Sequence, residues 1–472
     1  MAFRKPQAWL LAAILFYFLF FFHLSATGML APDEPRYASV GREMARSGDW
    51  VTPRLWGEPW FEKPALLYWM TGAAFRLGLN ADLAPRLPVA IASVTFLIFF
   101  FFTLRREFGW QPAAYATAIL ATSAGWVAYS QNGVTDIPLA ATFSAAVLLS
   151  LRWVKSGDRH PWLPVASGML ALAVLAKGLV PLVLIAPVIW IGRRRIADLL
   201  RPQVWGTFLA IAAPWYILCY LRNGRPFLEK FFWEHHFARF SSTSLLHEQP
   251  FWFYGWVLLA GLFPWTPLVL LIRRKDDPRW RMLALTVAFG IVFFSLSVNK
   301  LPGYLLPLLP ALAALMGIAL AESRRSTAVL IACAVLAGFI PVIAGLLPQA
   351  LARGITRSHL SVAGWMWTIP VLLGLSIMRL RAAIAMVVLT MAVIAGVVYV
   401  KLASLPKVEQ AYSARPIWRE IAGRREQVCI EQMERSWRYG LNYYSESPLP
   451  DCAVSDRPFH IVQPPDEPPK VK

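Results

Sequence analysis

Long apolar stretches alternate with short polar connections along the chain. Each stretch approaches the roughly twenty residues that a helix needs to cross a bilayer. The pattern predicts an all-α polytopic membrane protein with about 13 transmembrane helices. The expected spans are 8–28, 87–104, 112–130, 137–153, 162–176, 179–192, 204–221, 251–272, 281–298, 302–320, 327–347, 362–378 and 382–400.

The first stretch has a second interpretation, because Arg4 and Lys5 precede it as in a secretory signal. The stretch is long, however, and residues 25–28 (Ser-Ala-Thr-Gly) form a poor cleavage site. We therefore expect an uncleaved first span.

Composition agrees with a membrane protein, since 57% of the 472 residues are hydrophobic and 15% are charged. A net charge of +19 in a soluble protein would suggest nucleic acid as a partner. Here the basic residues fall in short gaps between spans, as the positive-inside rule expects, so we expect no nucleic acid partner. The clusters are Arg4/Lys5, Arg105/Arg106, Arg152/Lys155/Arg159, Arg193–Arg195/Arg201, Arg273–Lys275/Arg279/Arg281, Arg324/Arg325 and Arg379/Arg381.

These clusters predict which segments face which side. They occupy the N-terminus and six short loops on the cytoplasmic side, which leaves the loops 29–86 and 222–250 and the tail from 401 outside. The assignment requires a break between two spans at Lys177-Gly178, because without it every later cluster would change sides.

The first external loop, 29–86, predicts two interfacial helices. Pro35 suits a first helical turn with Glu34 as its flanking cap, and Gly48 suits the end. Tyr37, Val40 and Met44 then share one face, as in a helix that lies along the membrane surface. The pattern recurs after Glu62-Lys63, with Pro64, an apolar helix through Phe75, and Gly78.

The polar tail predicts a second domain, 401–472, after a membrane domain of residues 1–400. Ile417–Ile421 and Val428–Ile430 suggest a small α/β fold, which at about seventy residues needs support from the membrane part. The last dozen residues, with two Pro-Pro pairs, are predicted to be disordered. Cys429 and Cys452 would lie in an oxidising compartment, so we expect a disulfide, with two free thiols as the alternative. Cys219 and Cys333 fall in apolar stretches and are expected to be packing residues.

Ionisable residues gather at the external membrane surface, where they are costly and therefore functional candidates. Two of these groups have a plain structural interpretation as well. Asp33 and Glu34 could be a solvated loop acid and a helix cap. His235-His236 could bind a metal with Glu62 or Glu234, but the spacing is not HExxH, and an interfacial histidine pair explains it equally well.

Five motifs in order resemble the bacterial aminoarabinose transferase family, which belongs to the polyprenyl-phosphate-sugar glycosyltransferases of the GT-C fold and is related to protein O-mannosyltransferases. The resemblance covers about residues 1–320, and the tail is shorter than is typical of the family. The motifs are Asp33-Glu34-x-Arg36-Tyr37, Gly48-Asp49-Trp50, Phe61-Glu62-Lys63-Pro64, Asp136-x-Pro138-Leu139 and Lys300-Leu301-Pro302-x-Tyr304-x-Leu306-Pro307.

The resemblance implies inverting transfer of a sugar from polyprenyl (undecaprenyl) phosphate to lipid A or another envelope lipid or glycan. It implies a monomer in the bacterial inner membrane, with its active site facing the periplasm and membrane lipids around it. No cofactor is required, although a divalent metal such as zinc or magnesium fits the family. By residue, it implies catalytic roles for Asp33 and Asp136, donor phosphate contacts for Lys63, Arg36, Arg239, Lys300 and Tyr304, and metal contacts for Glu62 and His236.

Three other functions are consistent with parts of the sequence. The first is a protein or polysaccharide transferase that uses another polyprenyl-phosphate sugar, such as mannose or galactosamine. A transporter or lipid flippase would also need many spans, but such proteins commonly show internal repeats, and no convincing repeat is visible here. A noncatalytic scaffold would not need acids and bases clustered at one membrane depth.

Overall fold

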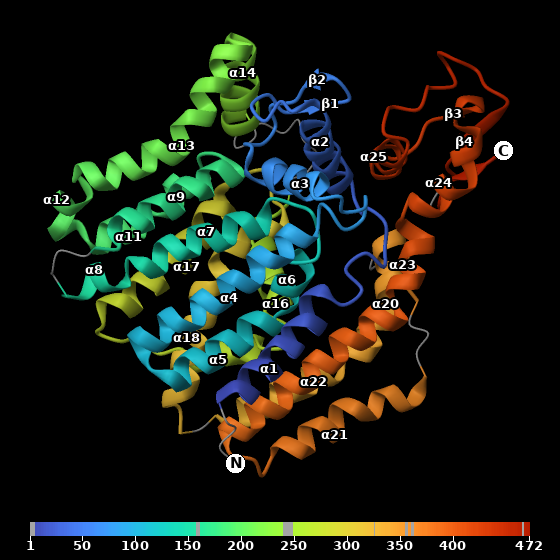
Figure 1. The fold of residues 1–472 in the computed structure, drawn as a ribbon. Helices are drawn as coiled ribbons and strands as arrows, with labels where there is room; N and C mark the ends of the chain where they lie inside the picture. The colour runs from blue at the N-terminus through green and yellow to red at the C-terminus, as the bar shows by residue number, and fades with distance from the viewer. Residues whose placement is uncertain are drawn as a thin grey trace.

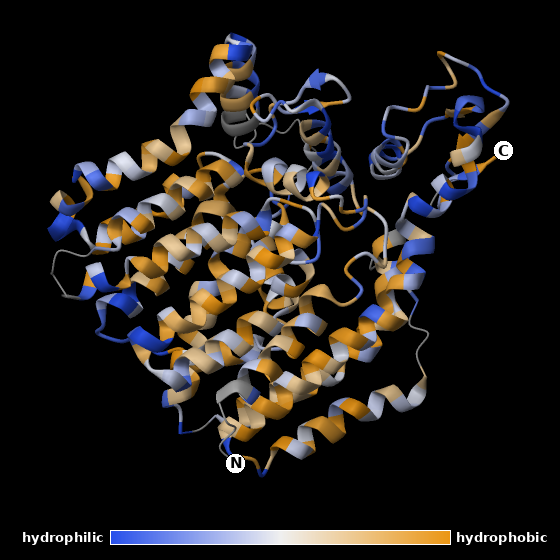
Figure 2. Ribbon diagram, viewed as in Figure 1, coloured by the Kyte–Doolittle hydropathy of each residue, from blue (hydrophilic) through white to orange (hydrophobic). Residues whose placement is uncertain are grey.

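The computed structural model describes residues 5–156, 161–238, 249–324, 326–354, 357–359, 363–464 and 467–472. Its helices form an inclined bundle, with the first external loop and the tail at one end and the N-terminus at the other (Figure 1). Hydrophobic residues dominate the bundle, whereas the tail and the connections at the opposite end are more hydrophilic (Figure 2). The molecule therefore has the apolar body and polar ends of a multi-pass membrane protein.

Within the described residues, six helical segments are long and apolar enough to cross a membrane. They are α4 (Leu87–Phe108), α7 with α8 (Asp136–Leu149, Leu151–Ser156), α13 (Pro202–Asn223), α17 (Pro278–Leu296), η5 with α18 (Pro302–Leu308, Leu309–Glu322) and α22 (Ala382–Ala403).

The other predicted spans coincide with shorter or broken helices, so the number thirteen stays a prediction. One pair, α19 (Thr327–Gly338) and α20 (Ile340–Arg353), bends by 46° at its break. These elements are α1 (Lys5–Phe16), η1 (Tyr17–Phe21), α5 (Trp110–Thr122), α6 (Ala124–Tyr129), α9 (Leu163–Lys177), α10 (Val180–Leu184), α11 (Ala186–Ile191), α16 (Phe253–Gly261), η4 (Thr266–Leu271), α19 (Thr327–Gly338), α20 (Ile340–Arg353), η7 (Gly364–Trp367) and α21 (Thr368–Ile377).

The centre of the bundle is formed by α18, which packs against α5. In the most apolar stretch of the segment that contains α18, 89% is buried, compared with 22% for α13 at the periphery. A Cβ at Gly317 would lie 2.6 Å from the amide nitrogen of Ala116. Small residues therefore let these two backbones approach closely, as is common between membrane helices.

The predicted break at Lys177-Gly178 is confirmed. Helix α9 ends at Lys177, Gly178 adopts a φ of +84°, and α10 starts two residues later. A positive φ is easily reached by glycine, which explains why the chain can turn there.

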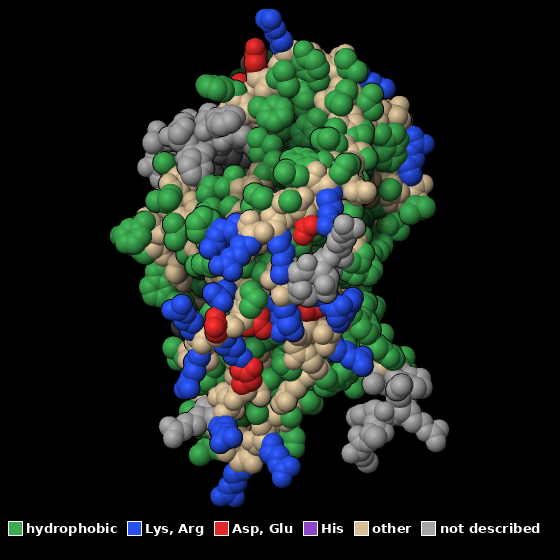
Figure 3. Space-filling view, turned by 90° about the vertical axis from the view of Figure 1, so that its left-hand side faces the viewer, with side chains coloured by type: hydrophobic (Ala, Val, Ile, Leu, Met, Phe, Trp, Pro, Cys, Tyr) green, Lys and Arg blue, Asp and Glu red, His purple; other side chains and the backbone are tan. Residues whose placement is uncertain are grey.

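Basic side chains gather across the middle of one face of the molecule, with few acidic side chains among them (Figure 3). This face belongs to the side of the bundle that carries α8 and α12 (Ile196–Leu199), next to η2 (Arg193–Arg195). Such a cluster is what the positive-inside rule predicts for the cytoplasmic side. The orientation in the membrane stays a prediction.

The first external loop contains both predicted helices, α2 (Asp33–Ser47) and α3 (Leu66–Arg76), joined through a hairpin of β1 (Arg54–Leu55) and β2 (Glu58–Pro59). Helix α2 ends at Ser47 and is capped, as predicted, by Gly48, whose φ is +75°. One detail was wrong, because the helix includes Glu34 rather than being capped by it. The helix is covered by α3 and the tail, so that even Arg42 is only 8% exposed.

The tail forms a small α/β unit. Its sheet has the order β3 (Val428–Ile430), β4 (Phe459–Val462), β5 (Lys470–Val471), with a parallel pair followed by an antiparallel pair. The helical elements are α23 (Leu405–Tyr412), α24 (Arg415–Ile421), η8 (Ala422–Gln427) and α25 (Arg435–Tyr444). The prediction of a disordered end was wrong for β5, because its pairing with β4 orders those residues.

As expected, the tail rests on the membrane part. Arg42 of α2 donates to the Tyr443 carbonyl at 2.6 Å, and the Tyr443 hydroxyl donates to the Ala81 carbonyl at 2.6 Å. Arg415 forms an ion pair with Asp82 at 2.6 Å. These contacts join α24 and α25 to the first external loop.

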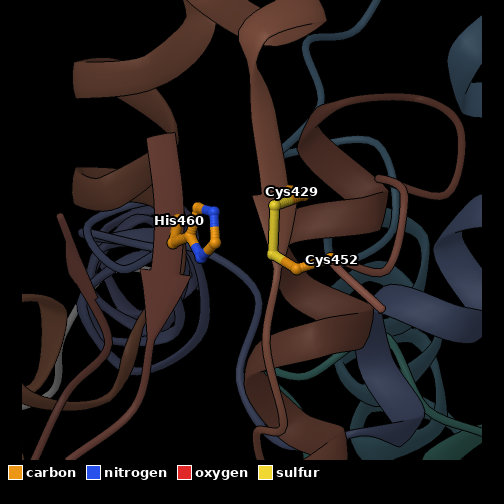
Figure 4. Close-up of side chains that lie close together, drawn as sticks. All are labelled: Cys429, Cys452 and His460. Atoms are coloured by element: carbon orange, nitrogen blue, oxygen red, sulfur yellow. A yellow bond between two sulfur atoms is a disulfide. The ribbon is translucent and has the colours of Figure 1, made fainter. Parts of the chain in front are cut away.

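The predicted disulfide between Cys429 and Cys452 is confirmed, and the two free cysteines, Cys219 and Cys333, are buried as expected. His460 lies beside this disulfide on β4 (Figure 4). The three side chains are close enough to suggest a metal site. Because the disulfide uses both sulfur atoms, it removes the thiolates that a metal would need.

Replacing both Cys429 and Cys452 with serine should destabilise the tail by about 3 kcal/mol, because the unfolded chain would regain the freedom of a loop of this size. The measurement is the unfolding of the tail in urea, detected by its susceptibility to proteolysis. A Cys219→Ser variant tests for a general effect of losing a thiol. Alkylation of both Cys429 and Cys452 in unreduced, folded protein would show that the bond does not form.

Candidate active site

A cavity of about 940 Å³ lies where the first external loop meets the bundle. Its polar part is lined by Asp33, Glu62, Lys63, Asp136, Lys177 and Tyr304. The apolar part includes one face of α20 and one face of α22, which contribute Ile340, Ile343, Leu347, Leu351, Val393, Val397 and Val400. A mostly apolar cavity with a few converging polar groups is the usual form of a ligand site.

Four charged residues form a network on α2 and just before α3. Arg36 pairs with Asp33 one turn earlier and, at 3.0 Å, with Glu62 Oε2. Lys63 Nζ lies 3.0 Å from Glu62 Oε1. The side chain of Asp33 is 44% exposed, whereas that of Glu62 is 7% exposed. Asp33 is therefore the carboxylate of this network that a ligand can reach.

The helices that carry the network pack closely at Gly41. A Cβ there would lie 2.7 Å from the side chain of Thr71 on α3. A larger residue would push the helices apart and separate Asp33 from Lys63.

Burial and charge set the protonation states of two network residues. Burial lowers the pKa of Arg36, but Glu62, Tyr37 and Asp33 together outweigh this effect, so the pKa lies above its usual value and Arg36 stays charged. Burial raises the pKa of Tyr37, and Glu62 raises it further. The Tyr37 hydroxyl therefore stays protonated.

A second pair lies across the cavity, where Lys177 Nζ contacts Asp136 Oδ1 at 2.7 Å. Lys177 Nζ also lies 5.2 Å from the centre of the Tyr304 ring. A Cβ at Gly303 would lie 2.3 Å from Asp136 Oδ1, so only glycine permits this approach. The sequence prediction used Lys177 only to divide two spans, although a lysine at membrane depth is itself a functional signal.

Glu34 is a buried ion-pair residue, which corrects its prediction as a helix cap. Its oxygens each accept from Arg86 at 2.7 Å and also accept from the amides of Leu30 and Gly133 at 2.9 Å. Both charged residues are 1% exposed. The pair joins the start of α2 to the segment that leads to Asp136.

One predicted residue, Lys300, is not brought into this group. Lys300 does not line the cavity; it is 6% exposed and donates to the carbonyls of Ser297, which does line it, at 2.6 Å and of Gln249 at 2.9 Å. Arg239 lies outside the described residues, and so do the side chains of His235 and His236. Glu62 contacts two cations, Arg36 and Lys63, which makes its carboxylate unsuitable for a divalent ion in this arrangement.

Lys401 is a further cavity residue that the sequence prediction missed. It is 3% exposed and donates to the carbonyls of Leu19 and Phe22, each at 2.9 Å. These bonds satisfy carbonyl groups at the end of η1, as basic residues often do at helix C-termini.

Comparisons with known proteins agree with this architecture. Residues 62–218 match the family model described as dolichyl-phosphate-mannose-protein mannosyltransferase. The crystal structure of ArnT from Cupriavidus metallidurans bound to undecaprenyl phosphate superposes with a TM-score of 0.77 at 25% identity, covering 98% of this chain and 87% of that one. The same protein in the apo state gives a TM-score of 0.74.

Two curated relatives are named undecaprenyl phosphate-alpha-4-amino-4-deoxy-L-arabinose arabinosyl transferase. One, from Pseudomonas paraeruginosa, is 31% identical over 68% of this chain and 61% of its own length. The other, numbered 2 and from Pseudomonas fluorescens, is 32% identical over 67% of this chain and 57% of its own length. The chain thus matches less than two thirds of the length of these relatives.

The superposition shows that the chain has the fold of ArnT, with acids and cations converging on the cavity. The resemblance seen in the sequence is confirmed, because about two thirds of the chain is similar to the curated aminoarabinose transferases and its fold matches that of ArnT.

Proposed function

We propose that this chain is an inverting glycosyltransferase of the inner membrane that transfers a sugar from undecaprenyl phosphate to lipid A or another envelope lipid or glycan on the periplasmic side. The cavity carries this proposal, because it places acids, cations and a long apolar wall together. The names of the relatives make 4-amino-4-deoxy-L-arabinose the first sugar to test.

The cations suit the departure of a lipid phosphate. As the bond between the anomeric carbon and the phosphate oxygen breaks, that oxygen gains negative charge. Lys63, Lys177 and Tyr304 line the polar part of the cavity and can stabilise this charge. Arg36 and Lys63 both form ion pairs with Glu62.

Asp33 suits the attacking side of the reaction. If the acceptor is a hydroxyl, its oxygen forms the new bond to the anomeric carbon while Asp33 accepts its proton. If the acceptor is a phosphate, the nucleophile is already anionic, and Asp33 orients it or stabilises positive charge on the sugar. Attack opposite the leaving phosphate inverts the anomeric centre. Asp136, held by Lys177, would contact the sugar from the other side.

Mass spectrometry of envelope lipids and glycans, with and without the protein, tests the function. We expect a mass increment of one sugar that disappears on deletion, and this increment would identify the acceptor. Purified protein supplied with a polyprenyl-phosphate sugar should restore it. Identical lipid and glycan profiles, together with no transfer in vitro, would contradict the proposal.

Lys63→Ala should weaken donor binding and turnover together, because the donor phosphate is charged in the ground state and in the transition state. Losing one charged contact should lower the affinity for the donor by about tenfold or more. Binding of the polyprenyl-phosphate sugar and its transfer are measured separately. The control is Lys407→Ala, which removes an exposed lysine of α23. Normal donor binding in Lys63→Ala would place the phosphate elsewhere.

A further inference from the structure

An aromatic seam joins the first external loop to the tail on the outer side of the active-site network. We define it as Trp56 in the β1–β2 turn, Trp60 just after β2, and Tyr439 on α25. The rings of Trp56 and Tyr439 are stacked, with centroids 5.7 Å apart and an angle of 20° between their planes. All three side chains are partly exposed.

Trp56 occupies a backbone conformation that a tryptophan rarely adopts. Leu55 pairs with Glu58, so the hairpin loop is only Trp56-Gly57, and both residues have a positive φ, +56° and +88°. Such two-residue turns favour asparagine or aspartate followed by glycine. A bulky residue with this φ carries backbone strain, and strain of this kind gathers at functional sites.

The seam also holds hydrogen-bond donors that lack acceptors. Among the described residues, no acceptor forms a hydrogen bond with the buried indole nitrogens of Trp56 and Trp60 or with the buried Nε of Arg36. Buried donors without partners are costly. All three groups are donors, so the ligand that would satisfy them must supply oxygen atoms.

Arg36 connects the seam to the reaction centre. Its guanidinium carbon lies 5.6 Å from the centre of the Trp60 ring and 5.5 Å from that of Tyr439, while its Nη2 pairs with Asp33 and Glu62. A ligand on the seam would therefore lie one side chain away from Asp33.

We propose that the aromatic seam binds the carbohydrate headgroup of the acceptor. A sugar ring presents C–H groups on its faces, which suit the negative faces of aromatic rings, and oxygens on its edge, which suit the unpaired donors. Arg435, 5.7 Å from the Tyr439 ring centre, adds a positive charge that would favour a phosphorylated sugar. This inference rests on the proposed function and specifies its acceptor as a glycolipid.

Binding of the deacylated, phosphorylated glucosamine disaccharide of lipid A to the full chain, measured by calorimetry without donor, tests the inference. Trp56→Asn and Tyr439→Ala should each weaken it about 2- to 10-fold, the range expected for one aromatic contact. Trp60→Phe, which keeps a ring and removes the N–H, should weaken it as well. Tyr439→Phe is the control and should bind as the wild type does.

Measurements of thermal stability distinguish headgroup binding by the seam from a purely structural role. Asparagine suits the turn better than tryptophan, so Trp56→Asn should melt at or above the wild-type temperature while binding is lost. A lower melting temperature with unchanged binding would mean that the seam only fastens the tail, and would overturn the inference. Equal binding of inorganic phosphate and the disaccharide would also overturn the inference. Because the assay uses no donor, a failure of sugar transfer is a separate result.

Discussion

Asp33→Asn should lower turnover by about 10²- to 10⁴-fold while donor binding survives. Asparagine keeps the size and polarity of the side chain but removes the negative charge and the proton acceptor, whose contribution to catalysis has this magnitude. Lys63 keeps its partner Glu62 in the variant, so the proposed contact to the donor phosphate is retained. The measurement is transfer from a purified polyprenyl-phosphate sugar, with donor binding followed independently.

The matched control is Asp276→Asn. The side chain of Asp276 is 94% exposed and pairs with Arg281, and neither residue lines the cavity. This variant should transfer sugar at the wild-type rate. Near-normal turnover in Asp33→Asn would remove Asp33 from the mechanism and make Asp136 the next candidate.

Glu34→Gln should destabilise the protein by about 3–5 kcal/mol, which is the usual effect of removing one partner of a buried ion pair. Arg86 would keep its charge at 1% exposure without a counterion. The new amide group would also place a donor where the carboxylate now accepts from Arg86, Leu30 and Gly133. Thermal unfolding and the yield of monodisperse protein measure this effect. Glu420→Gln, at an exposed position on α24, is the control.

A double variant distinguishes the effect of an unpaired buried charge on stability from the effect of the changed side-chain shape. Glu34→Gln with Arg86→Met removes both charges, so no unpaired charge remains buried. It should be more stable than Glu34→Gln alone. A wild-type melting temperature for Glu34→Gln would contradict the structural role of Glu34.

The neighbouring acids Asp33 and Glu34 show why the sequence could locate this site without assigning its residues. Successive positions on a helix point in different directions, about 100° apart. Asp33 therefore reaches the Arg36 network while Glu34 reaches Arg86. The partner of Glu34 lies 52 residues later, and nothing in the local pattern distinguishes the two acids.

At the break after Lys177, the sequence likewise located a feature without assigning the role of its residue. The hydrophobic pattern located the break, and the positions of the basic clusters supported it. The role of the lysine depends on Asp136, which lies 41 residues earlier on another helix. Trp56 was not predicted at all, because its strain appears only once the hairpin register is known.

The sequence by itself determined the apolar helices, the two helices of the first external loop, the break at Lys177 and the disulfide partners. These features depend on short segments, whose length, periodicity and turn residues are written locally. Only the tertiary structure decided that Arg36 shares Glu62 with Lys63, that Lys177 holds Asp136, that Glu34 is structural, and that the tail reaches Arg36. A charge has many candidate partners along a chain, and helix packing selects among them because a buried charge must be compensated where it lies.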